Sequence, residues 1–175
     1  AEERAGHTRA REVMEIERGL LEMSRDPTLD VKPALLEEGG VDLSHVRRMH
    51  APPGTALILV DAKGENVIAV VSGANRSVLP GDLAAAGPRK SEYLLLQQEI
   101  PLETVEAALR AGRKAGAISV LNTAPFRAEA ASFIGEADYI VANAPEFDLY
   151  ADALLLPKGD RTRRMAAFAE RPGRT

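Results

Sequence analysis

The spacing of hydrophobic positions changes twice along the chain. Over residues 9–23, apolar side chains recur every three or four positions, which places them on one face of a helix. The sequence Asp26-Pro27 ends this pattern. A second, shorter helix is predicted over residues 31–38, because Gly39-Gly40 follows it and glycine commonly ends a helix. The spacing therefore predicts two helices within residues 1–40.

β-branched residues in runs of strand length dominate the next stretch. Residues 55–60 and 66–71 are such runs, and Gly64 lies in the turn between them, where a positive φ is needed. This arrangement predicts a β-hairpin over residues 55–71, with residues 46–50 as a candidate third strand. Apolar side chains occupy both faces of the hairpin, so both faces require cover.

Short apolar runs alternate with helical spacing over residues 91–156. Pro101 lies where one helix is expected to begin, and Gly116 lies where it is expected to end. The order strand, helix, strand, helix, strand is typical of a parallel sheet with crossover helices. The expected strands are residues 93–97, 117–121, 138–142 and 153–156, and the expected helices are residues 100–115 and 128–134.

Three of these expected strands end in polar residues. The first is followed by Gln97-Gln98-Glu99, the second by Asn122-Thr123, and the third by Asn143, with Glu146 one helical turn later. In an open parallel sheet, ligands bind beyond the carboxyl ends of the strands. Each polar residue alone is equally consistent with a solvated loop, whereas three at one sheet edge favour a shared site.

The residue types indicate what such a site can bind. Glu99 can accept two hydrogen bonds from a vicinal diol, which suits a sugar, and Asn122 and Asn143 can each donate and accept. Glu146 offers hard oxygen ligands that suit Mg²⁺ directly or through water. The sequence shows no pairing of a nucleophile with a base and no phosphate-binding loop of the Gly-x-x-x-x-Gly-Lys-Ser/Thr type.

Composition narrows the chemistry further. The 175 residues include no Cys and only three His, which excludes disulfides and Cys-ligated metal sites. Four Phe, three Tyr and no Trp make a base-stacking surface improbable, and the net charge of −4 argues against a nucleic-acid-binding domain. No apolar run has the length of a membrane span or the character of a signal peptide, so we expect a cytoplasmic protein.

The charge is uneven along the chain. Residues 158–175 hold six basic and two acidic side chains. We interpret this stretch as a solvated tail or an amphipathic terminal helix, with a tail that binds phosphate or RNA as the alternative.

Six short segments carry a family resemblance. They are Gly40–Val46, Gly64–Ile68, Ser72–Asn75, Leu95–Glu103, Leu121–Pro125 and Asn143–Glu146. In this order, over about residues 35–147, they resemble the ribokinase-like, or PfkB-type, carbohydrate kinases. Each segment is weakly specific by itself, and their common order makes the resemblance specific.

The resemblance implies a Rossmann-like α/β core of three layers, incomplete in this chain, with a small β-hairpin lid. Together with the spacing, it divides the chain into a helical segment (1–40), lid strands (41–75), a partial kinase core (76–157) and a basic tail (158–175). In such kinases a sugar hydroxyl attacks the γ-phosphate of ATP in the presence of Mg²⁺. The lid often forms a dimer, so a homodimer through residues 55–71 is expected.

The same resemblance assigns roles to individual residues. Glu99 matches a carboxylate that binds sugar hydroxyls, and Glu146 matches a residue that organises Mg²⁺ and the ATP phosphates. The substrate-binding candidates are Glu99, Ala56, Val70 and Asn122, the cofactor-binding candidates are Asn143 and Glu146, and the metal-binding candidate is Glu146.

The sequence also departs from the family pattern. Residues 1–34 contain no Gly-Gly sugar-binding motif, and the Gly-Ala-Gly-Asp segment that supplies the catalytic base and the anion hole does not occur, so no catalytic residue is assigned. The usual Asn-Glu-Thr-Glu reads Asn143-Ala-Pro-Glu146. We therefore expect a truncated or interrupted carbohydrate kinase for ribose or a similar sugar. The alternatives are a non-catalytic remnant that binds sugar or nucleotide, a dimerisation module, and a regulatory module whose basic tail contacts nucleic acid.

Overall fold

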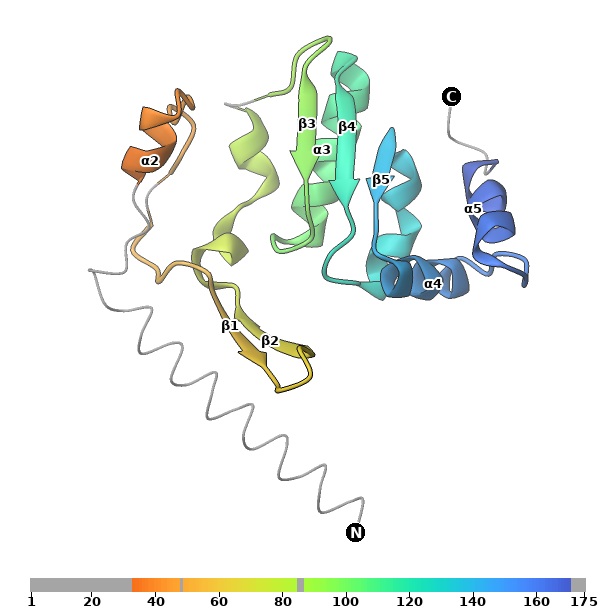
Figure 1. The fold of residues 1–175 in the computed structure, drawn as a ribbon. Coiled ribbons are helices and arrows are strands. Elements are labelled where there is room, and N and C mark those ends of the chain that lie inside the picture. Colours follow the sequence, from red (N-terminus) through yellow and green to blue (C-terminus); the bar gives the residue numbers. More distant parts are fainter. Residues whose placement is uncertain (1–32, 48, 85–86, 171–175) are drawn as a thin grey trace. The chain divides into compact units, whose positions relative to one another are not determined.

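The computed structural model describes residues 33–47, 49–84 and 87–170. The chain falls into two compact units, one ending at Arg76 and the other beginning at Ser77 (Figure 1). The helix expected over residues 9–23 lies outside the described residues.

The first unit begins with a short helix that ends where the sequence predicts. Helix α2 (Pro33–Glu38) is followed by Gly40, which has a φ of 79°. The N–H of Gly40 donates a hydrogen bond to the carbonyl of Glu37 at 2.9 Å. Glycine takes this left-handed conformation without steric cost, which is why the helix stops here.

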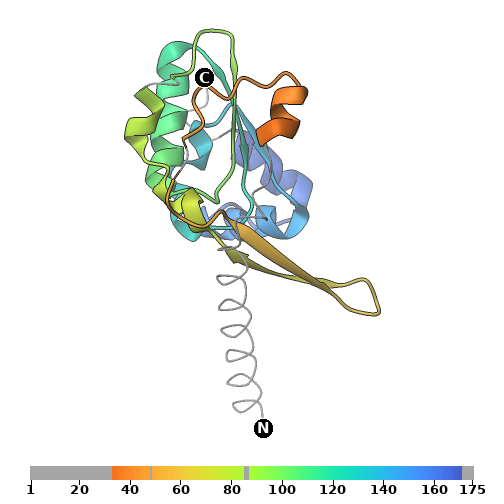
Figure 2. The same cartoon turned by 90° about the vertical axis from the view of Figure 1, so that its left-hand side faces the viewer.

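The predicted hairpin is confirmed with its expected bounds. Strands β1 (Thr55–Val60) and β2 (Asn66–Val71) pair antiparallel, with Ile58 directly opposite Ile68. Figure 2 shows the two strands side by side, with the turn at their far end. The side chains of Ile58 and Ile68 are 57% and 51% exposed, so the hairpin forms without a core of its own.

One carboxylate organises the turn of the hairpin. Asp61 Oδ1 accepts hydrogen bonds from the backbone N–H groups of Lys63 at 2.7 Å and of Glu65 at 3.0 Å. Gly64 supplies the positive φ, 82°, that the turn requires. The geometry of the hairpin is therefore set by residues that are close in sequence.

Residues 46–50 do not form the expected third strand where the structure describes them. The N–H of Val46 donates to the carbonyl of Leu43 at 2.9 Å, so the chain turns just before this segment. Pro52-Pro53 follows and has no N–H groups for a strand ladder. These two local constraints outweigh the strand preference of Val46.

The second unit is built around a three-stranded parallel sheet of order β3-β4-β5. This confirms the predicted α/β class and the alternation of strands with helices. Its strands are β3 (Tyr93–Leu96), β4 (Ile118–Asn122) and β5 (Tyr139–Val141), and its helices are α3 (Leu102–Ala115), α4 (Ala144–Ala153) and α5 (Arg161–Ala169). Two 3₁₀ segments, η4 (Ala128–Ser132) and η5 (Ile134–Glu136), replace the short helix expected at residues 128–134.

Helix α3 covers one face of the sheet and lies behind β3 and β4 in Figure 1. Pro101 precedes its first turn, and Gly116 ends it with a φ of 76°, as the sequence predicts. Val105 and Leu109 are completely buried. The buried hydroxyl of Thr104 donates to the carbonyl of Val78 at 2.8 Å, which ties the helix to the segment that precedes the sheet.

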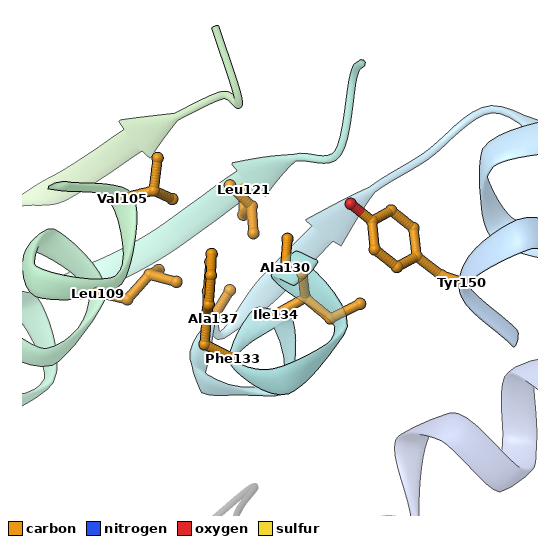
Figure 3. Close-up of a cluster of buried hydrophobic side chains, with 8 residues drawn as sticks. All are labelled: Val105, Leu109, Leu121, Ala130, Phe133, Ile134, Ala137 and Tyr150. Atoms are coloured by element: carbon orange, nitrogen blue, oxygen red, sulfur yellow. The ribbon is translucent and has the colours of Figure 1, made fainter. Parts of the chain in front are cut away.

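A single hydrophobic cluster fills the space between this face of the sheet and the segments that cover it (Figure 3). It combines residues from α3, β4, η4, η5 and α4, so the core depends on contacts between distant parts of the sequence. Its members are Val105, Leu109, Leu121, Ala130, Phe133, Ile134, Ala137 and Tyr150.

The opposite face of the sheet is apolar but exposed. Tyr93 and Leu95 on β3 are 69% and 74% exposed, and Tyr139 and Val141 on β5 are 62% and 53% exposed. We call these four residues the open face. Parallel sheets are normally covered on both sides, and the described residues of the second unit by themselves supply only one of the two covering layers.

The expected strand at residues 153–156 is wrong, because α4 continues through Ala153. Leu155 adopts a φ of 54°, and the N–H of Leu156 donates to the carbonyl of Ala151 at 2.9 Å, which closes the helix end. The apolar run is a helix terminus.

The basic stretch that begins at residue 158 contains helix α5, in agreement with the interpretation of this stretch as an amphipathic terminal helix. Within the part of the chain that the structure describes, no helix has the length and apolar character needed to cross a membrane.

Candidate functional site

The carboxyl ends of the three parallel strands lie together at one edge of the sheet. The backbone N–H of Gln98, just after β3, donates to the carbonyl of Ala124, just after β4, at 3.2 Å. The N–H of Thr123 donates to the carbonyl of Val141 at 2.9 Å. The loops that carry the three predicted polar clusters are therefore neighbours, which is the arrangement in which open α/β sheets bind ligands.

Glu99 and Asn122 lie at this edge, and both are exposed. The backbone N–H of Glu99 is hydrogen-bonded to the side-chain oxygen of Gln97, which fixes the loop that carries the carboxylate. Asn122 Oδ1 accepts a hydrogen bond from the N–H of Ala124 at 3.1 Å. The carboxylate of Glu99 can thus accept hydrogen bonds from a ligand, and the amide group of Asn122 can donate them.

Asn143 and Glu146 form a reciprocal cap at the start of α4. Asn143 Oδ1 accepts from the N–H of Glu146 at 2.8 Å, and Glu146 Oε2 accepts from the N–H of Asn143 at 3.1 Å. Such a capping box satisfies two helix-terminal donors. Both residues therefore have a structural role, which the spacing Asn-x-x-Glu at a helix start already indicates, although the sequence interpretation considered only ligand binding.

The cap leaves Glu146 able to bind a cation. A carboxylate has about four lone-pair positions, and one N–H occupies one of them. No group of three His, Asp or Glu side chains suited to a metal ion occurs among residues 33–47, 49–84 and 87–170. Because Mg²⁺ in nucleotide sites is usually held by one or two carboxylates together with substrate phosphates, the chemistry of Glu146 fits that ion.

A buried polar network that the sequence interpretation missed joins the loops after β3 and β4 to α4. The Tyr150 hydroxyl donates to Gln98 Oε1 at 2.8 Å and accepts from the N–H of Arg127 at 3.2 Å. Tyr150 and Gln98 are 3% and 1% exposed, and the Tyr150 ring meets Phe126 edge-on with centroids 4.7 Å apart. Gln98 Nε2 has no hydrogen-bond partner within the described part of the chain.

The strand period held a signal for this network. Leu94, Leu96 and Gln98 are two residues apart, so they share the covered face of the sheet. A glutamine at the third of these positions must bury its amide and requires a partner such as Tyr150. The sequence interpretation grouped Gln98 with its polar neighbours Gln97 and Glu99, whereas in the structure its side chain is buried and hydrogen-bonded to Tyr150.

Asp138 fixes the start of β5 against β4. Its Oδ2 accepts from both the N–H and the hydroxyl of Ser119 at 2.7 Å, and its own N–H donates to the Ser119 hydroxyl at 2.9 Å. The hydrogen bond from the Ser119 backbone is the main reason that the pKa of Asp138 lies below its ordinary value, and the charge of Arg113 adds to it. These hydrogen bonds between Asp138 and Ser119 fix the register of β5 against β4.

Ala56 and Val70 belong to the first unit. They are directly opposite each other in the β1–β2 ladder, and both are exposed. Residues opposite each other in an antiparallel pair lie on the same face, so the structure places these two apolar candidates together on one face of the hairpin.

The pfkB family of carbohydrate kinases matches residues 33–171. The chain belongs to this family. A deoxyribokinase from Salmonella typhi is 34% identical over 118 residues, which cover 65% of this chain and 39% of that protein. A ribokinase from Schizosaccharomyces pombe is 34% identical over 128 residues, which cover 71% of this chain and 39% of that protein.

A solved structure supports the same assignment. The crystal structure of ribokinase from Thermotoga maritima matches with a TM-score of 0.60 at 27% identity, covering 71% of this chain and 41% of that chain. The ribokinase-like fold and the pfkB family resemblance inferred from the six segments are thereby confirmed. The chain spans about two fifths of the length of the relatives it matches.

Proposed function

We propose that this pfkB-family chain carries part of the substrate site of an ATP-dependent kinase for ribose or a similar pentose. The observation that carries the proposal is the convergence of three polar strand ends at one edge of the parallel sheet. Relatives over the same residues are named deoxyribokinase and ribokinase, which supports a pentose as the substrate. Since ATP is the phosphate donor, we place this function in the cytoplasm.

Glu99 and Asn122 are the proposed sugar contacts. The carboxylate of Glu99 can accept hydrogen bonds from two neighbouring hydroxyls, and hydrogen bonds to a charged group contribute more than neutral ones. Ala56 and Val70 are proposed to present an apolar face to the sugar ring.

Asn143 and Glu146 are proposed to lie toward the nucleotide phosphates. When bound there, Mg²⁺ would neutralise charge on the phosphates during transfer. Glu146 would supply a carboxylate oxygen to that ion, and Asn143 would hold Glu146 in place through the capping box. In the first turn of α4, Pro145 has no N–H and the N–H of Glu146 donates to Asn143, so the helix start would favour negative charge mainly through the helix dipole.

Binding without turnover is the activity that we propose for the chain alone. Phosphoryl transfer needs a base and electrostatic stabilisation of the transferring group. The Gly-Ala-Gly-Asp segment that provides these in the family does not occur in the sequence. A non-catalytic remnant that binds sugar or nucleotide is therefore the second candidate function. Both candidates, the truncated kinase and the remnant, are expected to bind ligand.

The test of the sugar site is a calorimetric titration with ribose. We expect weak binding that Glu99→Gln reduces by about tenfold or more, because a hydrogen bond to a charged group contributes about 1.5–3 kcal/mol. Glu103→Gln is the matched control, since Glu103 is also an exposed carboxylate but lies in the first turn of α3. Binding that Glu99→Gln leaves unchanged would refute the assignment.

Glu146→Gln separates the proposed cation role from the structural one. Glutamine at this position preserves a capping box but removes the charge. We expect unchanged thermal unfolding and weaker binding of Mg²⁺-ATP. Equal affinity of the two proteins for Mg²⁺-ATP would remove Glu146 from the nucleotide site.

We also propose that the hairpin, residues 55–71, forms a homodimer. Both faces of β1 and β2 carry exposed apolar residues, with Leu59 and Val67 paired on the face opposite Ala56 and Val70. Light scattering should give a dimer for the unmodified chain and a monomer for the Leu59→Lys, Val67→Lys double variant. A monomer at tens of micromolar in the unmodified chain would contradict this assembly.

A further inference from the structure

A polar pair lies inside the hydrophobic core of the α/β unit. Tyr150 is 3% exposed and belongs to the hydrophobic cluster, and its partner Gln98 is 1% exposed. The Tyr150 hydroxyl donates to Gln98 Oε1 at 2.8 Å, while Gln98 Nε2 has no hydrogen-bond partner within the described residues. A buried donor without a partner lowers stability, whereas two apolar side chains of similar shape would fill the same space without that cost. Stability alone therefore does not account for this pair.

The Tyr150 hydroxyl contacts both loops that carry the candidate sugar contacts. Gln98 directly precedes Glu99 in the loop after β3, and Arg127 lies in the loop that starts directly beyond Asn122. The N–H of Arg127 donates to the hydroxyl at 3.2 Å, and the Arg127 carbonyl oxygen, 3.1 Å away, is a second acceptor for it. In Figure 3 the Tyr150 side chain lies at the carboxyl ends of the strands, with its hydroxyl directed away from α4. One buried atom of α4 is thus a common anchor for the two loops.

The two loops are also bonded to each other directly. The N–H of Gln98 donates to the carbonyl of Ala124 at 3.2 Å, which is at the long end of the range for such a bond. Glu99 and Asn122 themselves are exposed. Two exposed groups bind one small ligand well only when the structure beneath them fixes their separation. The buried hydroxyl is placed to provide that support.

We propose that Tyr150 and Gln98 are positioning residues of the sugar site. The Tyr150 hydroxyl holds the loops after β3 and β4 at the separation at which Glu99 and Asn122 contact the same sugar. The inference rests on the proposed sugar-binding function. It adds two residues that touch no ligand themselves, and it gives a reason for a glutamine in the core.

Ribose affinity and thermal stability of the same variants test the proposal, with affinity measured at a temperature at which every variant is folded. Tyr150→Phe keeps the ring against Phe126 and removes the hydroxyl. We expect ribose binding to weaken by about fivefold, the factor that corresponds to one ordinary hydrogen bond. Chemical-shift titration of the ¹⁵N-labelled chain measures this Kd. Without sugar, the backbone amide of Gln98 should exchange faster with solvent, because its loop has lost the anchor.

The double variant Gln98→Leu, Tyr150→Phe separates positioning from stability. Neither new side chain has a polar group to bury, so part of the stability lost in Tyr150→Phe should return. Ribose affinity should stay low, because the hydroxyl that holds the two loops is still absent. An affinity that returns together with the stability overturns the proposal.

Two single variants are the controls. Tyr139→Phe makes the same chemical change at a tyrosine that is 62% exposed at the start of β5. Ile134→Val trims a completely buried side chain of the same cluster in η5, which precedes the start of β5 and so lies toward the opposite edge of the sheet. We expect neither to change ribose affinity.

The outcomes distinguish this inference from the proposed function. Unchanged ribose affinity in Tyr150→Phe overturns the positioning role and leaves the sugar site standing. An equal loss of affinity in Ile134→Val also overturns it, because affinity would then follow stability. An unmodified chain that binds no ribose refutes the proposed function and the positioning role with it.

Discussion

The β1–β2 hairpin and the α/β unit differ in what holds them together. The hairpin is defined by local interactions, with Asp61 organising the turn and Ile58 and Ile68 left more than half exposed. The α/β unit is defined by contacts between distant residues, such as Leu109 of α3 and Leu121 of β4, which are completely buried. A segment can therefore have a well-defined shape without contributing a core, and the buried core of the described residues lies in the second unit.

A second contrast lies within the sheet of the α/β unit. Its covered face buries the hydrophobic cluster, while its open face leaves Tyr93, Leu95, Tyr139 and Val141 exposed. Parallel sheets with two covered faces are the rule. The missing cover on the open face agrees with the partial coverage of the relatives.

Removal of a core side chain should cause the largest loss of stability among the changes considered. We expect Leu109→Ala to destabilise the α/β unit by about 2–5 kcal/mol, because it removes a fully buried side chain and leaves a cavity. Leu59→Ala in the hairpin, where the side chain is 48% exposed, should cost much less. Thermal and urea unfolding measure both. Similar losses for the two variants would show that the hairpin has a core after all.

The Tyr150 network provides the next largest effect. Tyr150→Phe keeps the ring against Phe126 but leaves Gln98 Oε1 and the Arg127 N–H without the hydroxyl, which should cost about 1–3 kcal/mol. The double variant with Gln98→Leu should recover part of that loss, because it removes a buried polar partner as well. A loss that is additive in the double variant would mean that the two side chains act independently.

A substitution in the hairpin turn should destabilise the hairpin alone. Asp61→Ala removes the acceptor for two backbone N–H groups, and we expect about 1 kcal/mol of local destabilisation. Amide exchange should accelerate in β1 and β2 and stay unchanged in β4. Faster exchange throughout the sheet would show that the two units unfold together.

The smallest expected effect is a dependence on pH. The pKa of Asp138 is lowered in the folded chain, mainly by the Ser119 backbone hydrogen bond, so the stabilisation is present above its ordinary pKa of 3.8 and is lost as the pH falls through the lower, folded value. Asp138→Asn removes the titrating carboxyl and should flatten the pH dependence of Tm below about pH 4. Ser119→Ala keeps the backbone N–H and removes only the hydroxyl, so it should flatten the profile in part, and Ser132→Ala, at an exposed serine, is the control. An unchanged pH profile for Asp138→Asn would exclude this contribution.

The sequence predicted the parts of the fold that depend on local rules. The hairpin follows from two β-branched runs and Gly64, and the bounds of α3 follow from Pro101 and Gly116. The error at residues 153–156 arose because three consecutive leucines are compatible with a strand or with a helix end. Only the tertiary structure shows Leu155 in a left-handed conformation with its side chain exposed.

Part of the candidate site was also predictable, because it depends on the order of strands and helices along the chain. Strand order brings Glu99, Asn122 and Asn143 to one edge of the sheet, and the sequence pattern already implied that order. The Gln98–Tyr150 contact joins residues 52 positions apart, so no local spacing could reveal it. The open face depends on what lies over the sheet, and the pattern of the strands themselves does not encode that layer.

The most direct test of the central claim is a titration of the ¹⁵N-labelled chain with ribose, followed by amide chemical shifts. We predict that the amide chemical shifts of Glu99, Asn122 and their loops change together with one dissociation constant. Glu99→Gln should weaken this binding. The amides of α5 should not move. Shifts confined to α5, or shifts at the strand ends that Glu99→Gln leaves unchanged, would contradict a sugar site at this edge of the sheet.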